Sequence, residues 1–257
     1  MEILRTQDLE VHVGDLLVCR QLELVVNRGE RWCLLGPNGV GKTTLLHTLM
    51  GLHACSGGEI TIDYRKLAEL SRRDIARLVG ILFQEGLDSM PASVLETALL
   101  GRHPYARSLL WDDATDLAIA RDALALMGLE NMSGRQVDRL SGGERQRLAL
   151  ARLLAQQPRL YLLDEPSNHL DIGFQVKLQQ VLLSRLEADN SALLMASHDI
   201  NFAARFCDHF ILLNGDGSAL SGTRQEVLNK ETLSAVFACE MDSVSRDGRE
   251  FFFPASA

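Results

Sequence analysis

The sequence has no apolar run long enough to span a membrane as a helix. Its apolar stretches are short, as at residues 192–196, whereas a spanning helix needs about 20 such residues. The opening Met-Glu-Ile-Leu-Arg has no secretory pattern. With 46% apolar residues in a chain of 257, we expect a soluble globular protein that takes part in membrane processes only through a partner.

Cysteine and positive charge are also in short supply. The five cysteines are scattered, odd in number and without a C-x-x-C pair, which suits reduced thiols in a cytoplasm. The 26 Lys and Arg residues are outnumbered by 34 Asp and Glu, which leaves a net charge of −8. Bulk charge therefore does not draw the chain to phosphate backbones or to anionic lipid, and we expect no nucleic acid as its main partner.

Internal repeats and low-complexity linkers are absent too, so hydrophobic periodicity indicates the organisation. Leu- and Val-rich segments at residues 3–13 and 16–26 predict a β-ribbon or meander. Strand and helix signals then alternate to about residue 213, which indicates βαβ units and a mostly parallel sheet. From residue 91 to 157 helical spacing takes over, which predicts a helical insertion. The predicted elements are strands at 32–35, 58–63, 78–83, 160–163, 192–196 and 210–213, helices at 72–77 (capped by Ser71), 173–188 and after Asp199, a glycine-rich turn at 214–217, and short helices near Glu226 and Leu233.

Residues 36–43 follow one of these strands and read Gly-Pro-Asn-Gly-Val-Gly-Lys-Thr. They fit G-x-x-x-x-G-K-[ST], the pattern of a P-loop, at every specified position. The glycines let backbone N–H groups converge on one anion, and a helix that begins near Lys42 adds the positive end of its dipole. We expect Lys42 along the β- and γ-phosphates and the Thr43 hydroxyl on Mg²⁺. A plain glycine turn would not need this ordered set, so we predict a nucleoside triphosphate site.

Two carboxylates end the apolar strand at 160–163. Asp164 suits a ligand of Mg²⁺, and Glu165 suits the base that takes a proton from water. A carboxylate pair at a strand end is common by chance, but the P-loop upstream favours the functional interpretation. His198 follows the strand at 192–196, and a lone histidine at such a place is more often structural than catalytic.

The helix that begins after Ser141 carries two signals. Ser141 and Glu144 have the S-x-x-E spacing of a capping box, which is a purely structural feature. The box alone does not explain the paired Gly142 and Gly143, which expose N–H groups at the helix start. We therefore predict a second anion site there in addition to the cap.

Together these motifs resemble those of the ATP-binding cassette (ABC) ATPases over nearly the whole chain. The matches, in order, are Walker A at 36–43, the Q-loop at Gln84, the LSGGQ signature at 140–144, Walker B at 160–164, the catalytic glutamate at Glu165, the D-loop at 167–171 and the switch histidine at His198. The resemblance implies ATP-binding residues Gly36, Pro37, Asn38, Gly39, Val40, Gly41, Lys42, Thr43, Thr44, Ser141, Gly142 and Gly143, metal contacts at Thr43, Gln84 and Asp164, and catalytic roles for Glu165, His198 and Gln84.

The resemblance also implies an α/β fold. We expect a P-loop NTPase core, made of a mostly parallel sheet with helices, plus an N-terminal antiparallel β-subdomain and an inserted α-helical subdomain. Residues 1–257 would form a single ABC nucleotide-binding domain. Within it, residues 1–85 and 158–257 would make up the core and the β-subdomain, and residues 86–157 the helical subdomain with the signature motif.

Two positions depart from the family pattern. Glu144 stands where the family often has Gln, which is a mild change because this side chain mainly caps the helix. Val13 aligns best with the aromatic residue that usually stacks on adenine, so we expect weak base stacking and a soft preference for ATP. His12 beside it is a minor alternative stacking residue.

Residues 99–105, Leu-Leu-Gly-Arg-His-Pro-Tyr, look like the G-R-x-P segment of ATPases that serve importers of ferric siderophores, haem and cobalamin. A helix end with Gly101 as its C-cap and Pro104 as a stop explains the same residues. The implied function is the ATP-hydrolysing subunit of an ABC importer for such a metal chelate, with ATP and Mg²⁺ as cofactors and ADP and phosphate as products.

The resemblance further implies partners and a location. Two copies of the chain would close over two ATP molecules, with Walker A and B of one copy facing Ser141 and Gly143 of the other. Integral-membrane permease subunits would contact the surroundings of Gln84 and the helical subdomain, and a periplasmic or surface substrate-binding protein would act indirectly. The chain would lie at the cytoplasmic face of the inner membrane as a peripheral subunit.

Other classes of cassette protein are alternatives. A DNA-acting cassette would carry long heptad or zinc-binding insertions and a ribosome-acting protein two cassettes, and the sequence has neither. A soluble non-transport ABC ATPase, for example one that serves iron–sulfur cluster assembly, stays open as the alternative. Only residues 99–105 and the surroundings of Gln84 speak against it.

Overall fold

The computed structural model describes residues 1–84, 91–106 and 114–255. The chain forms two compact units: Met1–Leu70, Leu162–Glu165 and Ala192–Ala257 make up the first, and Ser71–Tyr161 and Pro166–Ser191 the second. The division into subdomains made from the sequence stays a prediction. Its boundary between residues 85 and 86 lies outside the described residues.

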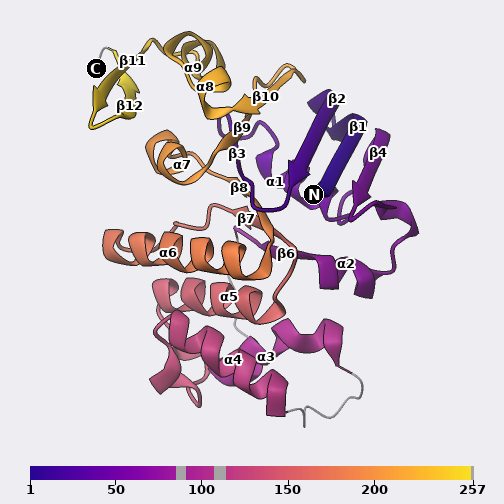
Figure 1. Ribbon diagram of the computed structural model, residues 1–257, viewed down its shortest axis with the longest axis vertical. Helices are drawn as coiled ribbons and strands as arrows, with labels where there is room; N and C mark the ends of the chain where they lie inside the picture. Colours follow the sequence, from indigo (N-terminus) through magenta and orange to yellow (C-terminus); the bar gives the residue numbers. More distant parts are fainter. Residues whose placement is uncertain (85–90, 107–113, 256–257) are drawn as a thin grey trace. The chain divides into compact units, whose positions relative to one another are not determined.

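The first unit is built on two larger sheets and a separate two-stranded hairpin (Figure 1). One is antiparallel with the strand order β2-β1-β4-β5, and the other has the order β10-β9-β3-β8 followed by the end of β7. Strand β3 runs parallel to both β8 and β9, whereas β10 runs antiparallel to β9. The predicted antiparallel ribbon and mostly parallel sheet are thereby confirmed. The elements are β1 (Glu2–Val13), β2 (Leu16–Asn27), β3 (Arg31–Leu35), α1 (Lys42–Leu49), β4 (Gly57–Ile62), β5 (Arg65–Lys66), β7 (Leu160–Asp164, which begins in the second unit), β8 (Ala192–Ala196), α7 (Ile200–Phe206), β9 (His209–Leu213), β10 (Ala219–Thr223), α8 (Arg224–Val227), α9 (Lys230–Phe237), β11 (Met241–Arg246) and β12 (Arg249–Pro254).

The central strands β3, β8 and β9 of the sheet that contains β3 are apolar over nearly their whole length. All of β8 is buried, as are residues 32–35 of β3 and 210–213 of β9. A strand buried on both faces needs apolar residues at every position, whereas β1 mixes buried with exposed ones. The P-loop follows β3 and the two carboxylates end β7, so the predicted phosphate residues lie at the carboxyl ends of these strands. That edge is where open α/β sheets bind their ligands.

The C-terminal part of the first unit contains strands that the sequence did not predict. The two expected short helices are present as α8 and α9, but β10 precedes them and a hairpin of β11 and β12 follows. Its turn is formed by Asp247 and Gly248, with φ of 53° and 72°, the pair of left-handed residues that a tight type I′ turn requires. The Asp-Gly pair is a hairpin signal, but the adjoining Phe-Phe-Phe at 251–253 shows no strand alternation.

The second unit is mainly helical, and α3 and α4 both pack against α5. Three of its helices, α2, α3 and α5, begin after serines: the side chains of Ser71, Ser93 and Ser141 each accept a hydrogen bond from the backbone N–H three residues on. The predicted cap at Ser71 is confirmed. The elements are α2 (Arg72–Leu78), β6 (Val79–Leu82), α3 (Val94–Leu99), a 3₁₀ helix (Leu100–Tyr105), α4 (Ala114–Leu126), α5 (Gly142–Gln156) and α6 (Ile172–Asp189); shorter 3₁₀ turns lie at Glu130–Met132 and Val137–Arg139.

The explanation of Gly101 as a helix cap is wrong. Helix α3 ends at Leu99, its C-cap Leu100 is right-handed, and the chain continues as a 3₁₀ helix that includes Pro104. A Cβ on residue 101 would lie only 2.2 Å from the carbonyl oxygen of Arg152 on α5. Glycine is therefore required there because two backbones approach closely, and not because the chain turns left-handed.

Candidate functional site

The P-loop connects β3 to α1 through glycines that no other residue could replace without strain. Gly41 has a φ of 100°, and a Cβ there would lie 2.5 Å from a methyl carbon of Val18. A Cβ on Gly36 would lie 2.7 Å from the carbonyl oxygen of Leu213. Helix α1 begins at Lys42, as predicted, and no side chain caps it. The N–H groups of its first turn are thus available to an anion.

Lys42 reaches back over the loop. Its Nζ donates to the carbonyl oxygens of Gly36 and Pro37, at 2.8 and 3.0 Å. Burial lowers the pKa of this amine, and the Glu165 and Asp164 carboxylates oppose that shift. The cation is therefore held at the concave side of the loop, where a bound phosphate would meet it.

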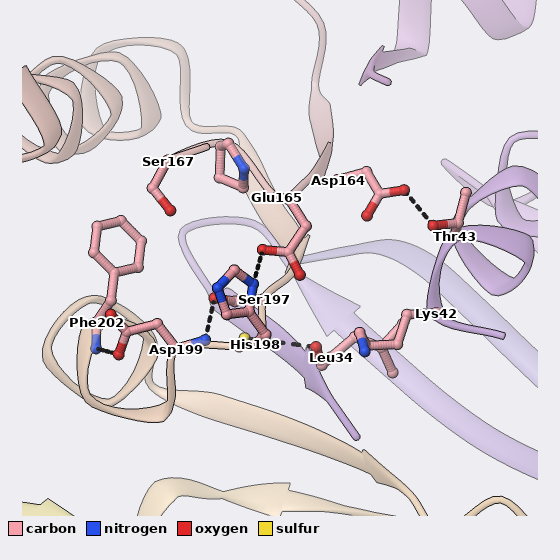
Figure 2. A network of polar contacts seen from close by, with 12 residues as sticks. Leu34, Lys42, Thr43, Asp164, Glu165, Ser167, Ser197, His198, Asp199 and Phe202 are labelled. Atoms are coloured by element: carbon pink, nitrogen blue, oxygen red, sulfur yellow. Dashed lines mark hydrogen bonds and ion pairs between the residues drawn. The ribbon is translucent and has the colours of Figure 1, made fainter. Parts of the chain in front are cut away.

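Asp164 ends β7 and points at the start of α1 (Figure 2). The Thr43 hydroxyl donates to Asp164 Oδ2 at 2.5 Å, which brings together the two predicted metal contacts of this unit. Burial raises the pKa of the Asp164 carboxyl, while the bond from Thr43 and the nearby His47 oppose the shift. His47 lies one turn after Thr43 on α1 and was not among the residues predicted from the sequence. Its signal is the i, i+4 spacing from a P-loop residue.

Glu165 points away from Asp164 and toward His198 (Figure 2). Its backbone is left-handed with a φ of 49°, and its N–H donates to the carbonyl oxygen of Ala196 at 3.1 Å. His198 Nδ1 lies 2.7 Å from Glu165 Oε2, within hydrogen-bond distance. The Glu165 side chain is 9% exposed and that of His198 61%. The arrangement presents a nearly buried carboxylate next to an accessible imidazole, a pairing suited to activating water.

The signature residues lie on the second unit at the start of α5. Both halves of the predicted capping box are present, because the Glu144 carboxylate accepts from Ser141 N–H at 2.7 Å and Glu144 N–H donates to Ser141 Oγ at 3.3 Å. Ser141 and Gly142 are exposed. Among the described residues, no atom lies within 4 Å of a Cβ added at Gly142, and for Gly143 only the carbonyl oxygen of His169 does, at 3.1 Å.

The remaining predicted residues have simpler surroundings. Asn38 and Gly39 are exposed at the tip of the P-loop, whereas Val40 is buried. The carbonyl oxygen of Thr44 accepts from the Thr48 hydroxyl on α1. Gln84 is exposed two residues after the end of β6 on the second unit.

The sequence of this chain matches a known protein family and is similar to known proteins. A protein-family model described as ABC transporter matches residues 19–168. The iron(3+)-hydroxamate import ATP-binding protein FhuC of Bacillus subtilis is 33% identical over 246 residues, which span 95% of this chain and 91% of that protein.

Solved structures agree. An inward-facing ABC transporter of the metal-chelate type superposes with a TM-score of 0.84 at 27% identity, over 99% of this chain and 98% of that chain. The ATP-binding cassette MJ0796, a dimer in a post-hydrolysis state with ADP and Pi bound, superposes with a TM-score of 0.75 at 27% identity, over 86% and 98% of the two chains. In the part of the chain that the structure describes, no helix combines the length and the apolar character needed to cross a bilayer.

Proposed function

The chain belongs to the ABC transporter family and is an ATPase of that family; we propose that it powers the import of a metal chelate, such as a ferric siderophore, haem or cobalamin. The observation that carries the proposal is the full-length similarity to an iron(3+)-hydroxamate import subunit, in a chain whose P-loop, Asp164 and the Glu165–His198 pair form one connected site. The non-transport alternative is less favoured, because the similarity to importer proteins spans nearly the whole chain.

The site's own groups fit magnesium-bound ATP. Thr43 Oγ1 and Asp164 Oδ2 are oxygen donors 2.5 Å apart, and Mg²⁺ prefers one or two such protein ligands together with phosphate oxygens. We therefore assign both residues, with Gln84, to the metal. When bound, Mg²⁺ supplies charge neutralisation for the β- and γ-phosphates. Residues 36–44 hold the phosphates, with Lys42 as their cation.

We assign hydrolysis to Glu165, which follows β7, and to His198, which follows β8. Glu165 takes the proton from the attacking water, because its carboxylate is shielded on all but 9% of its side-chain surface and directed by His198. The accessible imidazole of His198 stabilises the charge that develops on the γ-phosphate. Gln84 contacts the metal from the second unit. We assign the surface of that unit to the contact with the permease.

A second copy of the chain completes each site. Ser141, Gly142 and Gly143 present a helix start with exposed groups, and the related cassette MJ0796 is a dimer with ADP and Pi bound. We assign these three residues to the ATP held by the other copy. Permease subunits at the membrane then place the dimer at the cytoplasmic face, and a substrate-binding protein delivers the chelate to the permease.

Uptake in the native host tests the proposal. Replacing Lys42 by Ala removes the positive charge that holds the phosphates of ATP. Of three labelled chelates, ferric hydroxamate, haem and cobalamin, we expect the mutant strain to lose uptake of one. Arg205→Ala, on the exposed side of α7, is the matched control and should leave uptake unchanged. Normal uptake of all three chelates in the Lys42→Ala strain would contradict the assignment to metal-chelate import.

A further inference from the structure

One side chain fastens the C-terminal hairpin to helix α7. Asn201 Nδ2 donates to the carbonyl oxygen of Phe252 at 3.0 Å, and Phe252 N–H donates to Asn201 Oδ1 at 2.9 Å. The planar amide offers a donor and an acceptor side by side. It therefore pairs with the free edge of β12 much as one residue of a third strand would. Figure 1 shows α7 and β12 as neighbours within the first unit.

Both elements are short and gain stability from this contact, although α7 also packs against β3 and β11 against α9. Helix α7 has seven residues, well below the roughly 12–15 that an isolated helix needs in water. A two-stranded hairpin is marginal on its own, and most of this one is exposed, apart from Phe252 at 4% and Met241 at 9%. The paired hydrogen bonds between the Asn201 amide and the Phe252 backbone therefore stabilise helix and hairpin against each other.

Helix α7 is also the direct continuation of His198. Asp199 is the N-cap of α7, and its Oδ1 accepts from Phe202 N–H at 2.8 Å (Figure 2). On the other side, Ser197 N–H donates to the carbonyl oxygen of Leu34 at 3.2 Å. His198 is thus held between a fixed strand end and a short helix. Its exposed ring has little packing of its own to fix its direction toward Glu165.

We propose that Asn201 is a positioning residue for ATP hydrolysis: through β12 it holds α7 in place, and so keeps His198 in contact with Glu165. This makes the C-terminal hairpin part of the hydrolysis machinery, although it touches no reacting atom. The inference rests on the proposed role of His198. It adds that the precision of the Glu165–His198 pair depends on residues some fifty positions later in the chain.

Steady-state kinetics of the full-length chain test this role. Asn201→Leu keeps the approximate shape of the side chain and removes both hydrogen bonds to Phe252. We expect kcat to fall about tenfold, because small displacements of catalytic groups are costly, while KM for ATP changes less than about twofold since the P-loop is untouched. Arg205→Ala, on the same helix, should leave both constants unchanged. If the Leu variant does not fold, Asn201→Ser, too short to bridge both groups, takes its place.

A double-mutant cycle with His198→Ala separates the outcomes. If Asn201 acts through His198, Asn201→Leu costs nothing further once the imidazole is gone. An equal loss of kcat in both backgrounds, or an unchanged kcat in Asn201→Leu alone, would overturn the positioning role. An unchanged kcat in His198→Ala alone would instead overturn the role of His198 in the proposed function. Thermal unfolding of each variant, with kinetics measured well below the midpoint, shows that the protein assayed is folded.

Discussion

The residues assigned to ATP differ sharply between the two units. In the first unit they contact one another: Thr43 bonds Asp164, Glu165 faces His198, and Lys42 bonds the carbonyls of its own loop. In the second unit, the contacts of Ser141 and its glycines with other described residues are to their own helix start and to His169 in the loop beside it. One half of the site is organised within the chain, while the other is a surface feature.

The difference explains why glycine is found where packing does not demand it. Gly36 and Gly41 are required by close contacts within the first unit. Gly142 has open space around its Cα among the described residues, yet glycine loses more conformational freedom on folding than any other residue. A ligand from outside the chain that needs close access to the backbone N–H groups gives a reason for that cost.

The largest effect should come from Glu165→Gln, which tests the organised half. The amide keeps an oxygen for the contact with His198 but cannot take a proton, so we expect hydrolysis to slow by about 10²–10⁴-fold, or about 3–5 kcal/mol of barrier, with ATP binding intact. Phosphate release at saturating ATP and an equilibrium nucleotide titration measure the two quantities.

Glu187→Gln makes the same chemical change at an exposed position on α6 and serves as the control for Glu165→Gln. It should hydrolyse ATP at the wild-type rate. Unchanged steady-state turnover in Glu165→Gln would show that Glu165 is not the general base. It would also contradict the assignment of the hydrolytic groups to the first unit.

Ser141→Arg tests the surface half and should reduce hydrolysis by about 10²–10³-fold, because it blocks donors aimed at the phosphates. ATP binding by the isolated chain should persist, since the P-loop is unaltered. The substitution also removes a helix cap, a loss of about 1 kcal/mol. Ser93→Arg, which removes the same kind of capping box from α3, is therefore the matched control and should stay active.

Mixing inactive chains sharpens the test of shared sites. A dimer of Ser141→Arg with Lys42→Ala carries both defects at one site and leaves the other site intact, so part of the hydrolysis should return. If each chain works alone, the mixture stays inactive, and the wild-type rate rises in proportion to concentration down to the nanomolar range. That pair of results would remove the reason for assigning Ser141 and Gly143 to the nucleotide.

Residues that form contiguous motifs could be predicted from the sequence, whereas contacts between distant residues could not. The P-loop and the two carboxylates are contiguous patterns after apolar strands, so their place at the carboxyl ends of β3 and β7 followed from the sequence. The left-handed backbone of Glu165, at a φ of 49°, and the approach of His198 could not be predicted. They depend on the hydrogen bond to Ala196 of the neighbouring strand, a contact distant in sequence.

The misses in the fold have similar causes. Gly101 matched a helix end locally, but its role comes from Arg152 on α5, some fifty residues away. The hairpin of β11 and β12 lacks strand periodicity because it is exposed over most of its surface, and the backbone of its buried Phe252 is bonded to Asn201 of α7. Long-range contacts decide both positions, and local patterns carry no record of them.

The smallest effect concerns the part of the first unit that is expected to contact adenine. In contrast to the phosphate residues, which are held by mutual contacts, it should offer no aromatic side chain to stack on the base. Val13 is 41% exposed at the end of β1, while the His12 ring lies against Glu10 at 2.9 Å and, as the next residue of a strand, points to the opposite face. We expect poor discrimination between ATP and GTP.

Val13→Tyr should tighten nucleotide binding by about 1 kcal/mol, the typical free energy of an aromatic pair, whereas Val13→Leu adds apolar bulk without a ring and should change little. Competition titrations measure both, and a nucleotide-bound structure with an aromatic side chain from elsewhere over the adenine would refute the prediction.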